Sequence, residues 1–159
     1  MLRLSDFDAV TFDVYGTLID WEPSIAAFLG AWATKNGITA TDDALIMSFD
    51  RARAEIQKER PAHLYPEVLR RCFDRISSEH GVPVDRDMRE GFSRTPHDWP
   101  AYSDTEAGLK RLQASAKIGA LSNIDNASLA SSCAKMNIRF DIIVTAERVG
   151  AYKPSDEHF

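Results

Sequence analysis

The 159-residue chain lacks the features of membrane, nucleic-acid-binding and disulfide-rich proteins. No apolar run approaches the roughly 20 residues that span a bilayer, so no membrane segment is predicted. Basic residues are not in excess: 19 Lys and Arg against 24 Asp and Glu give a net charge of -5, which argues against nucleic acid as a partner. The two cysteines, Cys72 and Cys133, have neither disulfide-framework nor zinc-site spacing. Since the N-terminus also lacks the apolar stretch of a signal peptide, we expect a cytoplasmic protein.

The sequence does contain short apolar segments that alternate with amphipathic ones. Each apolar segment ends in a polar turn, as strands of a covered parallel sheet do. The expected strands are residues 8–14, 117–122 and 140–145. Helices are expected at residues 105–115 and 126–136, with Asp104 and Asp125 as candidate N-caps.

A different pattern occupies residues 20–94. Apolar residues recur there at helical spacing, and Gly or Pro residues close the segments. The expected helices are residues 21–36, a segment after Thr41 that ends before Pro61, residues 66–80 and residues 85–92. We therefore predict a doubly wound, Rossmann-like α/β core made by residues 1–19 and 95–159, with residues 20–94 as an inserted helical cap.

Polar residues follow each of the three predicted strands. The segment DVYGT, which begins at Asp13, follows the first strand; Ser122 and Asn123 end the second; Lys153 comes after the third. Because the carboxyl ends of parallel strands meet at one crevice, a carboxylate, a hydroxyl, an amide and an ammonium group are expected to converge there.

The segments FDVYGTLID, LSN and YKP resemble the first three motifs of the haloacid dehalogenase (HAD) superfamily. The predicted helical insert lies where that superfamily places its cap, so the resemblance covers nearly the whole chain. The superfamily also carries a fourth, acidic motif on the next core strand, whereas this sequence ends at Phe159. The resemblance thus implies a core that is incomplete at its C-terminus, cut from a protein of roughly 220–240 residues.

The same resemblance predicts an unusual sheet. The first strand should be central in this fold, but three strands leave one of its edges without a partner. An unpaired apolar edge promotes aggregation, so we expect either further chain or another cover at that edge.

The residue two positions after Asp13 separates subfamilies of this superfamily. Its phosphatases have a second aspartate there, which protonates the departing alkoxide, but this sequence has Tyr15. A halide leaves without a proton, so a tyrosine is tolerable for carbon–halogen cleavage and damaging for phosphate-ester hydrolysis. The pattern D-x-Y-G-T resembles the 2-haloacid dehalogenases, and Tyr15 would form a wall of the site and supply a hydrogen bond.

The resemblance implies two-step covalent catalysis on short 2-haloalkanoates. Asp13 would attack the halogen-bearing carbon to give an ester and free halide, and water would then release a 2-hydroxy acid. Lys153 would orient the nucleophile and offset its charge, and Thr17 would donate to its carboxylate or support its loop. Ser122 would donate to the substrate carboxylate, and Asn123 would help to hold the departing halide.

The charge of the substrate predicts one more cation. Two carboxylates that approach at low dielectric repel by several kcal/mol unless a cation lies between them. The dehalogenases usually add a cap arginine, and the predicted helix FDRARAEIQ offers Arg51, which we prefer, or Arg53. Because Asp50 and Glu55 are neighbours, both arginines could instead be ion-pair residues.

Two other functions stay open at this stage. One is a HAD-type phosphatase of a small phosphate ester, which would require Mg²⁺, whereas the dehalogenase requires no cofactor. The other is a non-catalytic fragment that keeps only the first three motifs. The expected partner is a small anionic molecule, and the resemblance also admits a homodimer.

Overall fold

The computed structural model describes residues 6–158 and divides the chain into two compact units. The sheet unit comprises the chain up to Asp20 together with Trp99 and the residues after it, and the helical unit comprises Trp21–Asp98. Each unit has its own buried core. In the described part of the chain, no helix combines the length and the apolar character that crossing a membrane needs.

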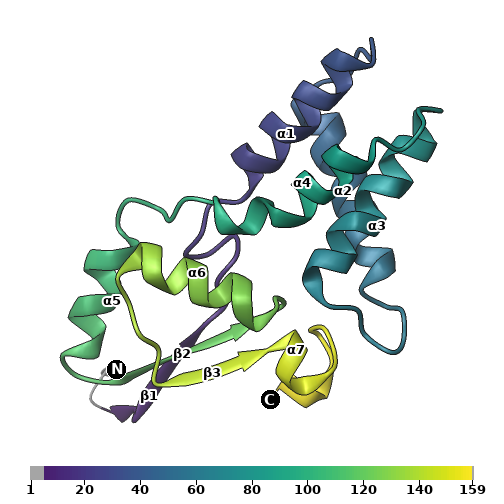
Figure 1. Ribbon diagram of the computed structural model, residues 1–159. Coiled ribbons are helices and arrows are strands. Elements are labelled where there is room, and N and C mark those ends of the chain that lie inside the picture. The colour runs from purple at the N-terminus through teal and green to yellow at the C-terminus, as the bar shows by residue number, and fades with distance from the viewer. Residues whose placement is uncertain (1–5, 159) are drawn as a thin grey trace. The chain divides into compact units, whose positions relative to one another are not determined.

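The sheet unit is built on three parallel strands in the order β1-β2-β3 (Figure 1). Its elements are β1 (Ala9–Phe12), α5 (Thr105–Gln113), β2 (Lys117–Ser122), α6 (Asn126–Met136), β3 (Ile142–Thr145) and the short α7 (Ala146–Val149). The predicted α/β fold with a parallel sheet is confirmed. The bounds of β2 and α6 are those predicted, β1 and β3 are shorter than predicted, and α7 was not predicted.

Local chemistry sets the ends of the helices in this unit. Asp125 Oδ1 accepts a 2.9 Å hydrogen bond from the Ser128 backbone N–H, so the N-cap predicted for α6 is confirmed. Asn137 ends the same helix in the left-handed conformation, at φ 51°. Asp104 lies at the predicted N-cap position of α5, but its side chain makes no capping hydrogen bond. Its backbone is helical, at φ -96° and ψ -9°, whereas capping side chains need an extended backbone.

The two faces of the sheet differ in burial. Ile118, Ala120 and Ser122, which alternate along β2, are fully buried. Right-handed crossovers place α5 and α6 on one face of the sheet, which is the covered face (Figure 1). On the opposite face Ile142 is 39% exposed, and a Cβ on Gly119 would lie only 3.2 Å from the Ile142 Cβ. Glycine therefore lets the strands approach closely at this position.

Strand β1 lies at the edge of the sheet. Within residues 6–158 it pairs with β2 alone, as expected for a core of three strands. A cavity of about 410 Å³ opens beside it and is lined in part by Phe12, Leu18 and Leu109. This edge of the sheet thus has no partner strand among the described residues, and the cavity beside it is lined by both apolar and polar side chains.

The chain leaves and re-enters the sheet unit through two bonded segments. The Asp20 backbone N–H donates to the Pro100 carbonyl at 2.8 Å, and the Tyr102 N–H donates to the Leu18 carbonyl at 3.1 Å. Thr105 Oγ1 donates to the same Leu18 carbonyl at 3.0 Å. These bonds fix the loop after β1 to the start of α5.

The helical unit packs around buried aromatic rings. Its helices are α1 (Glu22–Lys35), α2 (Asp42–Ile56), α3 (Tyr65–Glu79) and α4 (Arg86–Arg94), within a few residues of the predicted positions. The Phe73 ring lies 5.8 Å from the Trp32 ring and 5.7 Å from the Phe92 ring, between centroids. All three side chains are fully buried, so this cluster forms the centre of the unit.

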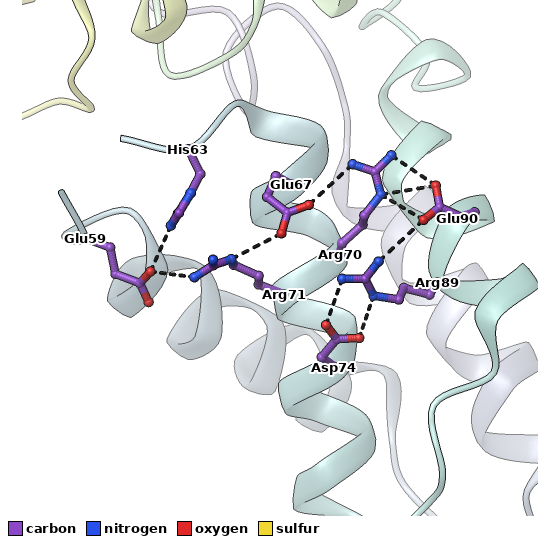
Figure 2. A network of polar contacts seen from close by, with 8 residues as sticks. All are labelled: Glu59, His63, Glu67, Arg70, Arg71, Asp74, Arg89 and Glu90. Atoms are coloured by element: carbon purple, nitrogen blue, oxygen red, sulfur yellow. Dashed lines mark hydrogen bonds and ion pairs between the residues drawn. The ribbon is translucent and has the colours of Figure 1, made fainter. Parts of the chain in front are cut away.

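A network of ion pairs joins α3 to α4 in the helical unit (Figure 2). Arg70 binds Glu90 through two oxygens, at 2.9 and 3.0 Å, and Arg89 binds Asp74 in the same way, at 2.7 and 3.0 Å. The hydrogen bonds that Arg70 donates to Glu90 lower the pKa of Glu90 and raise the pKa of Arg70. The network continues through Glu59, His63, Glu67 and Arg71.

We expect Arg70→Met to lower the melting temperature by a few degrees at pH 7, because the bidentate pair is lost. Since the folded-state pKa of Glu90 is lowered, the pair stabilises the fold above the ordinary glutamate pKa of about 4.3. That stabilisation is lost as the pH falls through the lowered value, so the difference from wild type should shrink below pH 4. Thermal unfolding at pH 7, 5 and 3 measures it. Lys58→Met, which breaks an exposed pair with Glu55, is the control, and a difference for Arg70→Met that is constant with pH would contradict the expectation.

Candidate active site

The loop after β1 turns sharply around one carbonyl group. The carbonyl of Val14, a fully buried residue, accepts hydrogen bonds from the N–H groups of Leu18 at 2.7 Å and Ile19 at 2.9 Å. Gly16 has φ 95°, which glycine adopts without the steric cost that a side chain would add. The turn leaves Asp13 at the carboxyl end of β1 with its side chain 44% exposed, so its carboxylate is accessible to a ligand.

Lys153 reaches this carboxylate from a loop that follows β3 and α7. Its Nζ lies 2.7 Å from Asp13 Oδ1 and also 2.7 Å from the Leu121 carbonyl oxygen. The fold thus joins two residues that are 140 positions apart in the sequence. The ammonium bonds to Oδ1, and the second carboxylate oxygen accepts no hydrogen bond among residues 6–158.

Ser122 ends β2 with an unsatisfied hydroxyl group. The residue is fully buried, and its Oγ has no hydrogen-bond partner among residues 6–158. A buried hydroxyl without a partner costs roughly 1–3 kcal/mol, so a ligand oxygen that accepted its hydrogen would remove that cost. This geometry fits the donor role predicted for Ser122, which stays a prediction.

Asn123 bonds to the backbone of Lys153 through both ends of its amide. Oδ1 accepts from the Lys153 N–H at 2.6 Å, and Nδ2 donates to the Lys153 carbonyl at 3.3 Å. The sequence predicted a contact with halide for Asn123 but not this link. The halide contact stays a prediction.

Tyr15 is anchored to two parts of the sheet unit. Its hydroxyl oxygen lies 2.8 Å from Ser132 Oγ on α6, and its ring packs edge-on against Trp99 with centroids 5.4 Å apart. The position two residues after Asp13 therefore holds an aromatic ring whose hydroxyl is engaged, and not a carboxylic acid.

The two remaining predicted site residues are Thr17, in the sheet unit, and Arg51, in the helical unit. The Thr17 backbone N–H donates to the Val14 carbonyl at 3.3 Å, while its side chain is exposed and has no hydrogen-bond partner in the described chain. Arg51 belongs to the helical unit, where it is 63% exposed and pairs with Glu79 at 3.2 Å. The roles predicted for both residues stay predictions.

Arg53, the alternative arginine, is more enclosed within the helical unit. Its guanidinium lies 4.9 Å from the centroid of the Trp21 ring and 2.6 Å from Asp50 Oδ1. Burial acts to lower the pKa of Arg53, but Tyr65 and Asp50 outweigh it and the pKa is raised overall. Arg51 and Arg53 thus both form ion pairs, as the alternative interpretation expects.

Some contacts of the candidate site had no signal in the sequence. The Leu121 carbonyl binds Lys153, and Ser132 on the face of α6 binds Tyr15. A motif does not show which backbone carbonyl will accept a bond, and Ser132 lies in no motif, so only the fold reveals these contacts. In the described chain, no three Asp, Glu, His or Cys side chains lie close enough together to hold a metal ion.

The chain is similar to known proteins in sequence and in fold. A family model described as haloacid dehalogenase-like hydrolase matches residues 7–159. No curated protein matches the sequence significantly.

Solved structures share the fold at low sequence identity. A defluorinating L-2-haloacid dehalogenase is 23% identical with a TM-score of 0.81, over 95% of this chain and 65% of its own. The L-2-haloacid dehalogenase of Xanthobacter autotrophicus, solved with chloropropionic acid covalently bound, is 19% identical with a TM-score of 0.77, over 96% and 62%. A Bacillus subtilis protein described as a HAD-hydrolase and bound to magnesium is 19% identical with a TM-score of 0.75, over 96% and 71%. The chain thus spans 65% of the length of the first of these proteins and 62% of the second.

Proposed function

Because the chain belongs to the haloacid dehalogenase-like hydrolase family, we propose that it cleaves the carbon–halogen bond of short 2-haloalkanoic acids. The observation that carries this proposal is the position of Tyr15. Its hydroxyl is bonded to Ser132 at 2.8 Å, so the loop after Asp13 presents an aromatic ring where an alkoxide leaving group would need an acid. A halide leaves as a stable anion and needs no proton, which makes it the leaving group that suits this loop.

The proposed reaction has two steps. In the first, Asp13 Oδ2 attacks the halogen-bearing carbon, an oxygen–carbon bond forms, and the halide leaves with the electron pair of the broken bond. In the second, water attacks the side-chain carbonyl carbon of this ester. The 2-hydroxy acid leaves, the carboxylate of Asp13 is restored and one proton is released to solvent.

Lys153 makes the first step electrostatically feasible. Two carboxylates 4 Å apart repel by about 4 kcal/mol at an effective dielectric constant of 20. The Lys153 ammonium, 2.7 Å from Asp13 Oδ1, offsets this repulsion and holds the carboxylate with its second oxygen available. The buried hydroxyl of Ser122 supplies a donor for the substrate carboxylate.

The comparisons support the fold of the proposed enzyme more strongly than its substrate. Neighbours below 25% identity share the fold, so the choice of a 2-haloacid depends on the residues of the loop after β1. The proposal includes the activity of the whole protein and its small anionic substrate. It also includes the role of the helical unit as a cap.

The test is halide release from 2-chloropropionate and 2-bromopropionate, with magnesium and with a chelator. We expect release and formation of lactate under both conditions, because a halide needs no Lewis acid to leave. Magnesium-dependent hydrolysis of p-nitrophenyl phosphate without halide release would contradict the proposal and favour a phosphatase. Failure to release halide from any short 2-haloacid would also contradict it.

A further inference from the structure

We propose that Asn123 is a positioning residue, which clamps the backbone of Lys153 so that the lysine ammonium stays on Asp13. The inference uses the reacting pair of the proposed function but does not depend on which bond that pair breaks. It goes beyond the halide contact predicted for Asn123.

The amide of Asn123 is bonded to one residue on both of its sides. Its Oδ1 lies 2.6 Å from the Lys153 nitrogen, and its Nδ2 lies 3.3 Å from the Lys153 carbonyl oxygen. The pair of bonds imitates the way a neighbouring strand holds a residue of a sheet. Asn123 therefore fixes the backbone on both sides of the Lys153 Cα.

Lys153 needs such a fixture because it lies outside the regular elements of the sheet unit. Helix α7 ends at Val149, Gly150 follows in the left-handed conformation at φ 71°, and Lys153 lies in the irregular segment after it. A lysine side chain is a flexible four-carbon stem, so the position of its ammonium depends on where its Cα is held. Without the amide, no strand or helix hydrogen bond would hold this backbone.

The far end of the same side chain is held by two acceptors. Nζ lies 2.7 Å from Asp13 Oδ1, at the end of β1, and 2.7 Å from the Leu121 carbonyl oxygen in β2. Asn123 itself follows β2 directly, between the buried residues Ser122 and Ile124. Asn123, which holds the Lys153 backbone, and Leu121, which accepts from the Lys153 ammonium, are thus two residues apart in the same stretch of chain. This stretch sets the distance between the backbone and the ammonium of Lys153.

The first experiment measures the clamp without any turnover, on the full chain. We expect Asn123→Ala to speed hydrogen exchange at the Lys153 backbone amide at least tenfold and to broaden the ¹⁵N signal of its ammonium group. Asn123→Asp keeps an acceptor for the Lys153 N–H and should retain most of the amide protection. Asn126→Ala, which removes a neighbouring amide bonded to Thr145, is the control and should change neither signal.

The second experiment separates positioning from direct contact with the halide. If Asn123 acts through Lys153, Asn123→Ala lowers kcat roughly tenfold to a hundredfold, equally for chloride and bromide leaving groups. The loss of kcat in the double variant Asn123→Ala/Lys153→Met should then equal the loss in Lys153→Met alone, because both substitutions remove the same function.

Two results would overturn the proposal. One is an unchanged Lys153 amide and ammonium signal in Asn123→Ala, and the other is a double variant whose loss is the product of the single losses. If the wild-type chain releases no halide at all, the proposed function fails, while the exchange and ammonium measurements still decide whether the clamp exists.

Discussion

Asp13→Asn should abolish halide release, with a loss of about 10⁴-fold or more. An uncharged amide oxygen is a poor nucleophile, and removal of a covalent nucleophile in other enzymes costs this much. The loss corresponds to about 5 kcal/mol of transition-state stabilisation. In the wild-type chain the Lys153 Nζ lies 2.7 Å from Asp13 Oδ1. Asparagine has nearly the same size and keeps an oxygen that can accept this hydrogen bond, so we expect the variant to fold. Ion chromatography of released halide, with circular dichroism of the variant, measures both effects.

Asp8→Asn is the matched control for this variant. Asp8 precedes β1 at the opposite end from Asp13, and its hydrogen bond to the sheet comes from its backbone carbonyl, which accepts from Lys117 at 3.2 Å. The control should keep wild-type halide release. Undiminished activity in Asp13→Asn would mean that another group attacks the substrate.

An isotope experiment distinguishes the covalent route from direct attack by water. With enzyme in excess in H₂¹⁸O, the ester route transfers an unlabelled oxygen of Asp13 to the product and leaves ¹⁸O in the Asp13 carboxylate. Direct displacement by water would place ¹⁸O in the product hydroxyl during the first turnover. Mass spectrometry of the product and of the peptide that contains Asp13 therefore decides between the two.

The parts of the fold that local chemistry determines were predictable from the sequence. Strand β2 and helix α6 have the predicted bounds, because an apolar run, a polar turn and the Asp125 cap each act over a few residues. Asp104 occupies the predicted N-cap position of α5 but makes no side-chain capping bond, and the reason is also local. Whether an Asp caps a helix depends on its own backbone angles, and the helical angles found there are not visible in the residue type.

The contacts of the candidate site were only partly predictable. Sheet topology alone brings Asp13 and Lys153 to one edge, and their ion pair at 2.7 Å is what the topology leads one to expect. The direction of a side chain on an irregular loop is set by tertiary contacts instead. No spacing in the sequence therefore indicated the two hydrogen bonds between the Asn123 amide and the Lys153 backbone.

Phe73→Ala should destabilise the helical unit by about 3–5 kcal/mol, the range for a buried phenylalanine cut back to alanine. Phe73 is fully buried, and its ring lies 5.8 Å from that of Trp32 and 5.7 Å from that of Phe92. The truncation removes the aromatic contacts of both neighbours and leaves a cavity that α1, α3 and α4 cannot fill without moving. Urea unfolding followed by far-ultraviolet circular dichroism reports this loss, because α1 to α4 contain most of the helix in the described chain.

Met47→Ala provides the control, since Met47 lies on α2 in the same unit but is 67% exposed. Its truncation should change stability by less than about 0.5 kcal/mol. A loss of several kcal/mol confined to Phe73→Ala would show that the stability of the unit comes from the interlocked rings. Equal small effects from both variants would instead mean that the unit tolerates the cavity, and that the ion pairs between α3 and α4 hold these helices together.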